Sequence, residues 1–157
     1  MIHRIDHTAI SVPDFDAALE FYAGVLGFEV LFRAGWPKGS ASIDALVGLE
    51  GSASKMAMLQ LGDTRIEIFE YQSPTPRPQA PGRPVNDHGI THICLRVSDI
   101  DAECQRLERA GVRFNIAVVD LGTERSVYGR DPFGNTLELL ERTAGAAAAD
   151  PPGGARR

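Results

Sequence analysis

The 157-residue chain predicts an α+β fold, in which two tandem βαβββ modules form a cleft with their curved sheets. The first observation is an internal repeat, because residues 5–17 align without a gap on residues 90–102. The second is a match near the end of each repeat, where Ile-Glu-Ile-Phe-Glu at 66–70 aligns with Leu-Glu-Leu-Leu-Glu at 137–141. The third is that each repeat shows one strand, one helix and then three strands.

The repeat pairs identical residues at equivalent places. The gapless part matches Ile5 with Ile90, His7 with His92, Val12 with Val97, Asp14 with Asp99, Asp16 with Asp101 and Ala17 with Ala102. At the far end of each repeat, Glu67 falls on Glu138. A duplicated unit with one His near its start and one Glu near its end supplies two of each. Such a set is what a metal site at the joint of two modules needs.

The first module is predicted to occupy residues 1–72. Alternating apolar and polar residues indicate a strand over 2–12, after which Asp14 caps a helix that Gly27 ends. A strand follows at 28–32, and then a long Gly- and Ser-rich loop at 33–54. The last two strands, at 55–61 and 64–71, form a hairpin. Loops of this length often bind ligands.

The second module is predicted at residues 88–142, after a Pro-rich linker at 73–87. It begins with a strand, and Ser98 or Asp99 caps its helix. The predicted strands, in order, are 88–97, 112–118, 124–129 and 137–142, with a turn at 131–135. The tail at 143–157 is rich in Ala, Gly and Pro and is predicted to be disordered.

The composition argues against several kinds of partner. The net charge is −5 and no run of Lys or Arg stands out, so nucleic acid and anionic membrane surfaces are poor partners. No apolar stretch is long enough to span a bilayer, and the first residues lack a signal-peptide core. Cys94 and Cys104 lack metal-ligand spacing and are predicted to be reduced thiols in a cytoplasmic protein. We expect Cys94, in a strand, to be a small buried apolar side chain.

The four repeated residues have an ordinary structural interpretation as well. A lone histidine on a strand face is more often a satisfied core side chain than a ligand, and a mid-strand carboxylate often pairs with an arginine. The available arginines are Arg65, Arg96 and Arg113. The repeat favours the metal interpretation, because a pseudo-two-fold axis would bring both His and Glu pairs together. His3 and His88 each stand four residues before these histidines, and we expect them at the surface.

With these residues in hand, the chain resembles the vicinal oxygen chelate superfamily, which includes glyoxalase I, extradiol dioxygenases and bleomycin-resistance proteins. The resemblance covers about residues 2–142, and the segments that carry it are 5–12, 66–70, 89–97 and 131–141. It implies paired βαβββ modules around a divalent ion (Ni, Co, Zn, Mn, Mg or Fe) that meets a small-molecule substrate, in a homodimer. It also implies four metal ligands, namely His7, Glu67, His92 and Glu138.

This ligand set is most similar to that of glyoxalase I. Sites of the methylmalonyl-CoA epimerase type have Gln where Glu67 stands, and an acidic base on the preceding strand, whereas residues 55–61 contain no carboxylate. The resemblance therefore implies a metal-dependent lyase or isomerase that acts on a small vicinally oxygenated substrate through an enediolate-like intermediate. Glu67 or Glu138 would be the catalytic base.

Two alternatives stay open. Residues 127–138 look like half of the extradiol dioxygenase signature, but no histidine precedes them at 117–121, and Glu67 would crowd an open site. In that signature Tyr128 contacts substrate, although a packing role is an equal prediction. The second alternative is a binding protein of the bleomycin-resistance type that sequesters a ligand without catalysis. The sequence names neither the substrate nor the metal.

Overall fold

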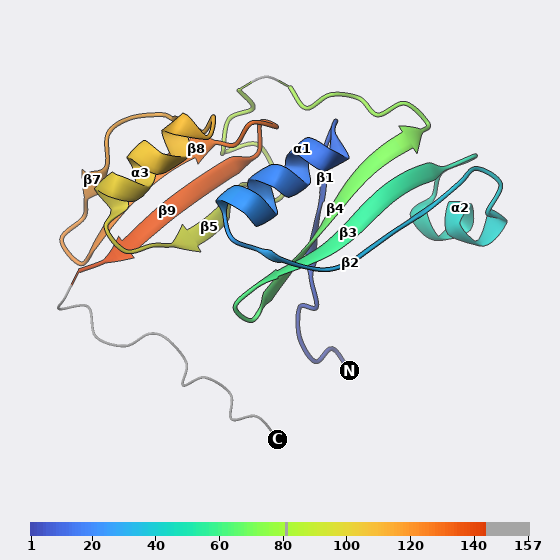
Figure 1. The fold of residues 1–157 in the computed structure, drawn as a ribbon, viewed down its shortest axis with the longest axis horizontal. Helices are drawn as coiled ribbons and strands as arrows, with labels where there is room; N and C mark the ends of the chain where they lie inside the picture. Colours follow the sequence, from blue (N-terminus) through green and yellow to red (C-terminus); the bar gives the residue numbers. More distant parts are fainter. Residues whose placement is uncertain (81, 144–157) are drawn as a thin grey trace. The chain divides into compact units, whose positions relative to one another are not determined.

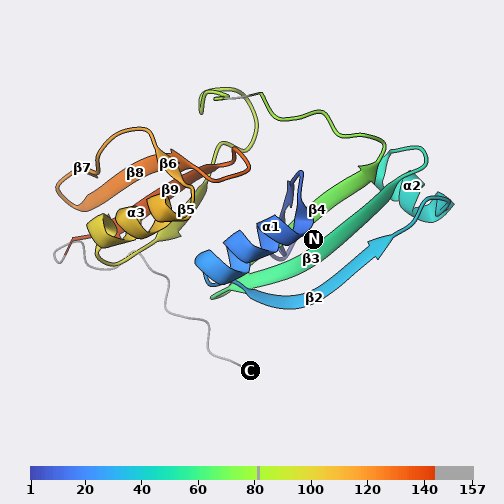
Figure 2. The same ribbon diagram turned by 45° about the horizontal axis from the view of Figure 1, so that its top comes forward.

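The computed structural model describes residues 1–80 and 82–143. The chain divides into two compact units, Met1–Ala80 and Pro81–Arg157, and the boundary falls inside the segment predicted as a linker. Each unit contains one sheet with a helix against one of its faces (Figure 1, Figure 2). The predicted disordered tail lies outside the described residues, apart from Thr143.

Unit 1 is a four-stranded sheet with the strand order β1-β4-β3-β2. Its elements are β1 (Thr8–Ser11), α1 (Phe15–Leu19), the π-helix η1 (Glu20–Val25), β2 (Glu29–Trp36), α2 (Ala41–Val47), β3 (Ala53–Leu61) and β4 (Thr64–Ser73). Strand β1 runs parallel to β4, whereas the other neighbours are antiparallel. The predicted hairpin is therefore the β3–β4 pair, joined at Gly62 and Asp63.

The predicted helix is present but changes its geometry half-way. The Asp14 side chain accepts a hydrogen bond from the Ala17 backbone amide at 3.0 Å, as a capping residue does. From Glu20 onward the helix is a π-helix, with the Leu26 amide donating to the Phe21 carbonyl at 2.9 Å. Gly27, at φ 83°, then ends it.

The prediction of one long loop over 33–54 was wrong. Strand β2 continues to Trp36, a seven-residue helix α2 follows, and β3 begins at Ala53. The sequence did carry signals of this helix that the prediction missed, because Ile43, Leu46 and Val47 have the i, i+3, i+4 spacing and Gly48, at φ 68°, ends it. Asp44 also accepts hydrogen bonds from the Gly51 and Ser52 backbone amides at 2.9 and 2.8 Å.

Unit 2 repeats the arrangement with the strand order β5-β9-β8-β6, and β7 also pairs with β8. Its elements are β5 (Ile93–Arg96), α3 (Ile100–Arg109), β6 (Arg113–Phe114), β7 (Val119–Asp120), β8 (Glu124–Arg130) and β9 (Thr136–Arg142). Again the first strand runs parallel to the last, β5 to β9. Asp99 caps α3 by accepting from the Ala102 amide at 3.3 Å.

Three predicted strands are shorter than expected. The strand at 2–12 is reduced to β1 and that at 88–97 to β5, because the backbone ladder with β4 or β9 covers four residues in each case. Of the strand predicted at 112–118 only β6 is present, and the short strand β7 begins directly after that range, at Val119. No helix among the described residues is long and apolar enough to cross a membrane.

The helix-facing side of each sheet forms the core. Ile66 and Ile68 of β4 are 2% and 0% exposed, and Leu137 and Leu139 of β9 are both 0% exposed. Since side chains alternate along a strand, Glu67 and Glu138 face away from the helix. The repeated motif therefore delivers one glutamate to the open face of each sheet.

Candidate functional site

The strand register of unit 1 brings His7 to Glu67. In the parallel β1–β4 ladder Ala9 lies opposite Glu67, and His7, two residues before Ala9, is on the same face. The His7 Nε2 atom lies 3.0 Å from Glu67 Oε2. The glutamate side chain is 15% exposed and the histidine 35% exposed, so the pair is reachable from the open face.

Unit 2 builds the same pair in the same way. Cys94 lies opposite Glu138 in the β5–β9 ladder, and His92 precedes Cys94 by two residues. The His92 Nε2 atom lies 3.1 Å from Glu138 Oε2. The carboxylates thus pair with histidines, whereas Arg65, one of the arginines considered as a partner, donates to Gln60.

The separation within each pair suits a shared cation. Metal–ligand bonds are about 2.1 Å long for His and carboxylate ligands of small divalent ions, so two ligands at adjacent corners lie about 3 Å apart. The measured 3.0 and 3.1 Å match this separation. They equally suit a hydrogen bond, so the chemistry of the nitrogen atoms has to be considered as well.

His7 lies between two carboxylates. Its Nδ1 is 3.1 Å from Asp6 Oδ1, while its Nε2 faces Glu67. A neutral imidazole carries a single N–H, so one of these nitrogen–oxygen contacts requires a second proton or a cation. When Nδ1–H donates to Asp6, the Nε2 lone pair faces Glu67, which is the arrangement of a metal-binding histidine held by a carboxylate behind it. The donor set therefore fits a divalent ion.

His92 is held in a related way by a neutral group. Thr91 Oγ1 lies 2.8 Å from His92 Nδ1, and the imidazole packs edge-on against the Tyr128 ring, with centroids 5.0 Å apart. In both repeats the residue directly before the histidine thus contacts its Nδ1 atom. Asp6 and Thr91 were not among the predicted site residues, although a polar residue directly before each repeated histidine is a signal that could have identified them.

Two hydroxyl groups on β8 hold Glu138. Ser126 donates to its Oε1 at 2.8 Å and Tyr128 to its Oε2 at 3.2 Å. Removal from water, with the nearby Glu138 charge, raises the pKa of the Tyr128 phenol, which keeps it a donor at neutral pH. Tyr128 therefore lies at the site as a partner of Glu138, and its predicted contact with substrate stays a prediction. Ser126 was missed, because its place follows only from the strand register.

Cys94 is not the buried apolar side chain that we expected. The residue is exposed and lies opposite Glu138 on the open face. Partial removal of the thiol from water, together with the Glu138 charge, raises its pKa to about 11. The thiol is thus protonated at neutral pH. His3 and His88 are exposed, as predicted.

Within each unit the pair stands alone. Across residues 1–80 and 82–143, no group of three or more His, Cys, Asp or Glu side chains is placed to hold a metal ion. Each unit supplies two donors, so a four-ligand site requires the two pairs to meet. The role of His7, Glu67, His92 and Glu138 as ligands of one ion stays a prediction.

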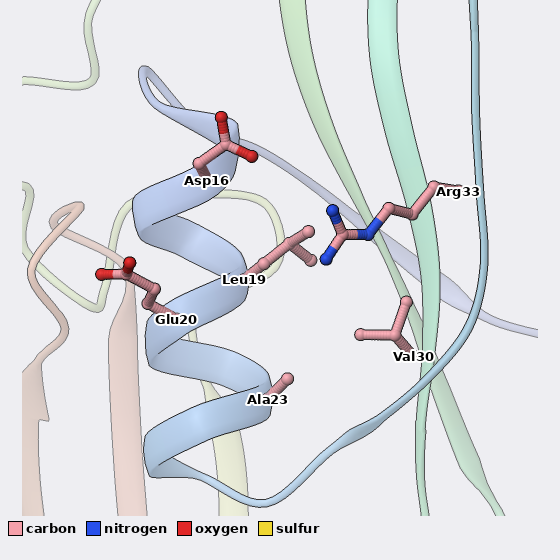
Figure 3. A pocket seen from close by; sticks show the side chains of 6 residues that line it. All are labelled: Asp16, Leu19, Glu20, Ala23, Val30 and Arg33. Carbon is pink, nitrogen blue, oxygen red and sulfur yellow. The ribbon is translucent and has the colours of Figure 1, made fainter.

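A separate hollow of about 280 Å³ lies in unit 1 between the helix and β2. Figure 3 shows Leu19 and Ala23 of the helix facing Val30 and Arg33 of β2. Val30 is paired with the fully buried Leu59 on the helix side of the sheet. The hollow is therefore on the opposite face from Glu67 and is no part of the His–Glu site.

Known proteins with similar sequences include several enzymes. The chain is 35% identical over 155 residues to a 2-epi-5-epi-valiolone epimerase of Actinomyces sp., and the match covers 90% of this chain and 81% of the relative. It is 28% identical over 146 residues to a lactoylglutathione lyase of Pseudomonas aeruginosa, with 87% and 81% covered.

Solved structures confirm the fold class. A glyoxalase family protein from Bacillus cereus superposes with a TM-score of 0.82 at 26% identity, covering 90% of this chain and 95% of that one. The fosfomycin resistance protein FosX from Listeria monocytogenes, in a complex with Mn(II) and sulfate, superposes with a TM-score of 0.62 at 20% identity. That match covers 92% of this chain and 96% of the other, and shows that a protein of this fold binds a divalent metal.

The family comparison agrees with the resemblance found in the sequence. The Glyoxalase/Bleomycin resistance protein/Dioxygenase superfamily matches residues 4–139, a range that includes both His–Glu pairs. The chain therefore belongs to the Glyoxalase/Bleomycin resistance protein/Dioxygenase superfamily.

Proposed function

We propose that this protein is a metal-dependent lyase or isomerase of the glyoxalase I type, acting on a small substrate with two adjacent oxygen atoms. One observation carries the proposal: each repeat places a histidine nitrogen 3.0–3.1 Å from a glutamate oxygen on the open face of its sheet. Two such pairs supply the two imidazoles and two carboxylates that suit a borderline or hard divalent ion.

The four side chains would hold one divalent ion, chosen from Ni, Co, Zn, Mn, Mg and Fe. When bound, such an ion polarises a substrate carbonyl and stabilises the negative charge that develops on its oxygen. The protein's own residues do the rest. Asp6 and Thr91 orient the two imidazoles, and Ser126 and Tyr128 orient the Glu138 carboxylate.

Proton transfer is the chemistry that remains for a carboxylate. A glutamate at the site takes the proton from the carbon beside the carbonyl, and the C–H electron pair moves into the carbonyl to give an enediolate. The same carboxylic acid then returns the proton to a substrate carbon. A positioned general base of this kind typically accelerates such a step by about 10²–10⁴-fold.

The named relatives support this class of reaction without fixing the substrate. One is called an epimerase and the other a lyase, and both activities are compatible with removal of a proton beside a carbonyl. A ring-cleaving dioxygenase needs an open coordination position, whereas Glu67 stands 3.0 Å from His7 and would fill one. The presence of all four donors argues against a ligand-sequestering protein, which does not need them for catalysis.

The test is deuterium wash-in. Protein stripped of metal and then reloaded with each ion is incubated in D₂O with α-oxoaldehyde hemithioacetals, acyl-CoA thioesters and catechols. We expect metal-dependent incorporation of deuterium beside a carbonyl, lost in His92→Ala and retained in His88→Ala, a matched change at an exposed histidine. Oxygen uptake with a catechol, or binding without exchange for every compound in the panel, would contradict the proposal.

A further inference from the structure

The open face of the unit 1 sheet carries three aromatic rings beyond Glu67, which we call the aromatic cluster. Phe69 and Tyr71 follow Glu67 at alternate positions of β4, so they share its face. Trp36 joins them from β2, because it lies opposite Ser54 of β3, and Ser54 lies opposite Tyr71. The Phe69 and Tyr71 rings stack with centroids 5.7 Å apart, and Trp36 packs edge-on against them at 6.1 and 5.9 Å.

The strand positions around the aromatic cluster are uncharged. On this face, the residues paired with the rows of Phe69 and Tyr71 are Ser11, Ala34, Trp36, Ser54 and Met56. Each of the three rings is half-buried, so part of it stays accessible to a ligand. An ionised group would lose its hydration here without gaining a charged partner, whereas the apolar face of a ring packs well against aromatic side chains.

Unit 2 lacks these rings on β9. The repeat alignment places Leu140 at the position of Phe69. It places Arg142 at the position of Tyr71, so a charged side chain stands where unit 1 has its second ring. The strand order is equivalent in the two sheets, so the fold itself does not require aromatic rings at these positions. The cluster therefore calls for an explanation other than packing.

A chain of hydrogen bonds fixes Trp36 from behind. Its Nε1 donates to Ser52 Oγ at 2.9 Å, and Ser52 Oγ donates to Asp44 Oδ1 at 2.5 Å. Ser52 is 0% exposed, and Asp44 belongs to α2, which lies beside the ends of β2 and β3 (Figure 1). Because the indole N–H is satisfied inside the protein, the ring is anchored at one edge and stays in the cluster.

We infer that the aromatic cluster is the part of the substrate site that selects a ring. The substrate that fits is a small compound whose two adjacent oxygens are carried on a carbon ring. Two residues along a strand span about 7 Å, so a ring whose oxygens meet the His7–Glu67 pair lies within contact of Phe69. Asp44 and Ser52 are positioning residues, because they act through the tryptophan. This inference rests on the proposed function and deepens it, because it names the class of substrate.

The first experiment compares a ring with an open chain of the same chemistry. Both 2-hydroxycyclohexanone and acetoin carry a hydroxyl group beside a carbonyl, but only the first is cyclic. With metal-loaded protein, deuterium exchange gives kcat/KM for each compound and calorimetry gives its affinity. We expect both quantities to favour the ring about tenfold, since it buries additional CH₂ groups. The fluorescence of Trp36, the single tryptophan, should change with the ring compound and not with acetoin.

The second experiment locates the preference for the ring. Phe69→Leu introduces the residue that unit 2 has at the equivalent position. We expect the ratio of kcat/KM for the ring to that for the open chain to fall about 2–10-fold, because a contact between rings is lost. Leu46→Ala, at an exposed position of α2, is the control and should keep the wild-type ratio. Urea titrations check that both variants are folded.

The third experiment tests the positioning role with a double-mutant cycle. Ser52→Ala removes the acceptor of the indole N–H, whereas Trp36→Phe keeps a ring and removes the N–H itself. We expect Ser52→Ala to lower the preference for the ring in the wild-type background and to have no further effect in the Trp36→Phe background. A change by the same factor in both backgrounds, or in neither, would overturn the positioning role.

The outcomes separate this inference from the proposed function. If metal-loaded wild type exchanges deuterium into no compound, the proposed function fails, and the two affinities still test the cluster. Tighter binding of the ring that weakens in Phe69→Leu supports the cluster even then. If wild type exchanges deuterium with no preference for the ring, or with a preference that Phe69→Leu leaves unchanged, the role of the cluster is overturned and the proposed function stands.

Discussion

The two repeats have the same donors and different neighbours. Each places a histidine against a glutamate at nearly the same separation, 3.0 Å in unit 1 and 3.1 Å in unit 2. Around Glu67 the opposing strand offers methionines, whereas around Glu138 it offers a serine and a tyrosine. The difference teaches that the ligand set alone does not describe a duplicated site, because the side chains behind the ligands decide how firmly each one is held.

The opposite face of the sheets is far more alike. Glu70 of β4 accepts from the Phe15 amide at 2.9 Å, and Glu141 of β9 accepts from the Ile100 amide at 3.3 Å. In both repeats the second glutamate of the motif therefore satisfies an amide at the start of the helix. The scaffold has stayed symmetric while the open face has diverged.

The largest expected effect concerns how the two units combine. Strands β1 and β5 are edge strands, and Ile5 and Ile90 beside them are 87% and 73% exposed. Apolar residues at an open edge favour pairing with further strands, so we expect a homodimer, in which the site forms either within one chain or, by swapping, from unit 1 of one chain and unit 2 of the other.

Mixing two inactive proteins tests this arrangement. One carries His7→Ala with Glu67→Ala, and the other carries His92→Ala with Glu138→Ala. Each protein alone should be inactive. When the two are refolded together in equal amounts, about half of the dimers are mixed and each mixed dimer has one intact site, so activity should rise to about a quarter of that of wild type. A monomer in sedimentation at every concentration, or a dimer without recovery, would refute the shared site.

The next effect tests the symmetry of the scaffold. Ile68 and Leu139 occupy equivalent, fully buried positions, so truncation of either leaves a cavity against the helix. We expect Ile68→Ala and Leu139→Ala each to lower the free energy of unfolding by about 2–5 kcal/mol in urea titrations. Leu46→Ala, at an 80% exposed position on α2, should change it by less than about 0.5 kcal/mol. A loss in only one of the two buried variants would break the symmetry.

The smallest effect concerns α2, which lies in unit 1 where unit 2 has the short strand β7. Hydrogen bonds from Ser52 and Gly51 hold the pKa of Asp44 below its usual range. Such a carboxyl stabilises the fold above its unfolded pKa of about 3.9, and this stabilisation is lost as pH falls through the lower folded value. We therefore expect the segment around α2 to loosen only below about pH 4.

Trp36 reports this transition, because it is the single tryptophan of the chain and its Nε1 donates to Ser52 Oγ at 2.9 Å. Its fluorescence should shift on acidification in wild type, and should already be shifted at neutral pH in Asp44→Asn. Asp63→Asn, in the exposed β3–β4 turn, is the control. Identical titrations of Asp44→Asn and wild type would contradict the assignment.

Much of this architecture could be predicted from the sequence, because it follows from local patterns. A periodic or positional signal is present for the repeat, for the helix caps Asp14 and Asp99, and for the alternation around Glu67 and Glu138. Helix α2 left the short apolar spacing of Ile43, Leu46 and Val47, which was overlooked within a segment rich in Gly and Ser. Strands β1 and β5 are short because each pairs with its neighbouring strand, β4 or β9, over only four residues. The sequence of the strand itself does not show where this pairing stops.

The same contrast applies to the site. The four donors could be identified because each recurs at its place in the repeat. Ser126 and Tyr128 are brought to Glu138 by the antiparallel register of β8 and β9, which a single sequence does not give. Cys94 was misjudged for another reason, because it lies on the open face of the sheet and is exposed, and strand periodicity alone does not tell which face is covered.

The central claim is that both His–Glu pairs hold one ion. Isothermal titration calorimetry of metal-free protein with Zn, Ni, Co, Mn, Mg and Fe tests it most directly. We expect one ion per chain for at least one of these metals, with binding weakened in both His7→Ala and His92→Ala and unchanged in His3→Ala. Absence of binding for every metal, two independent ions per chain, or unchanged binding in either of the two site variants would contradict it.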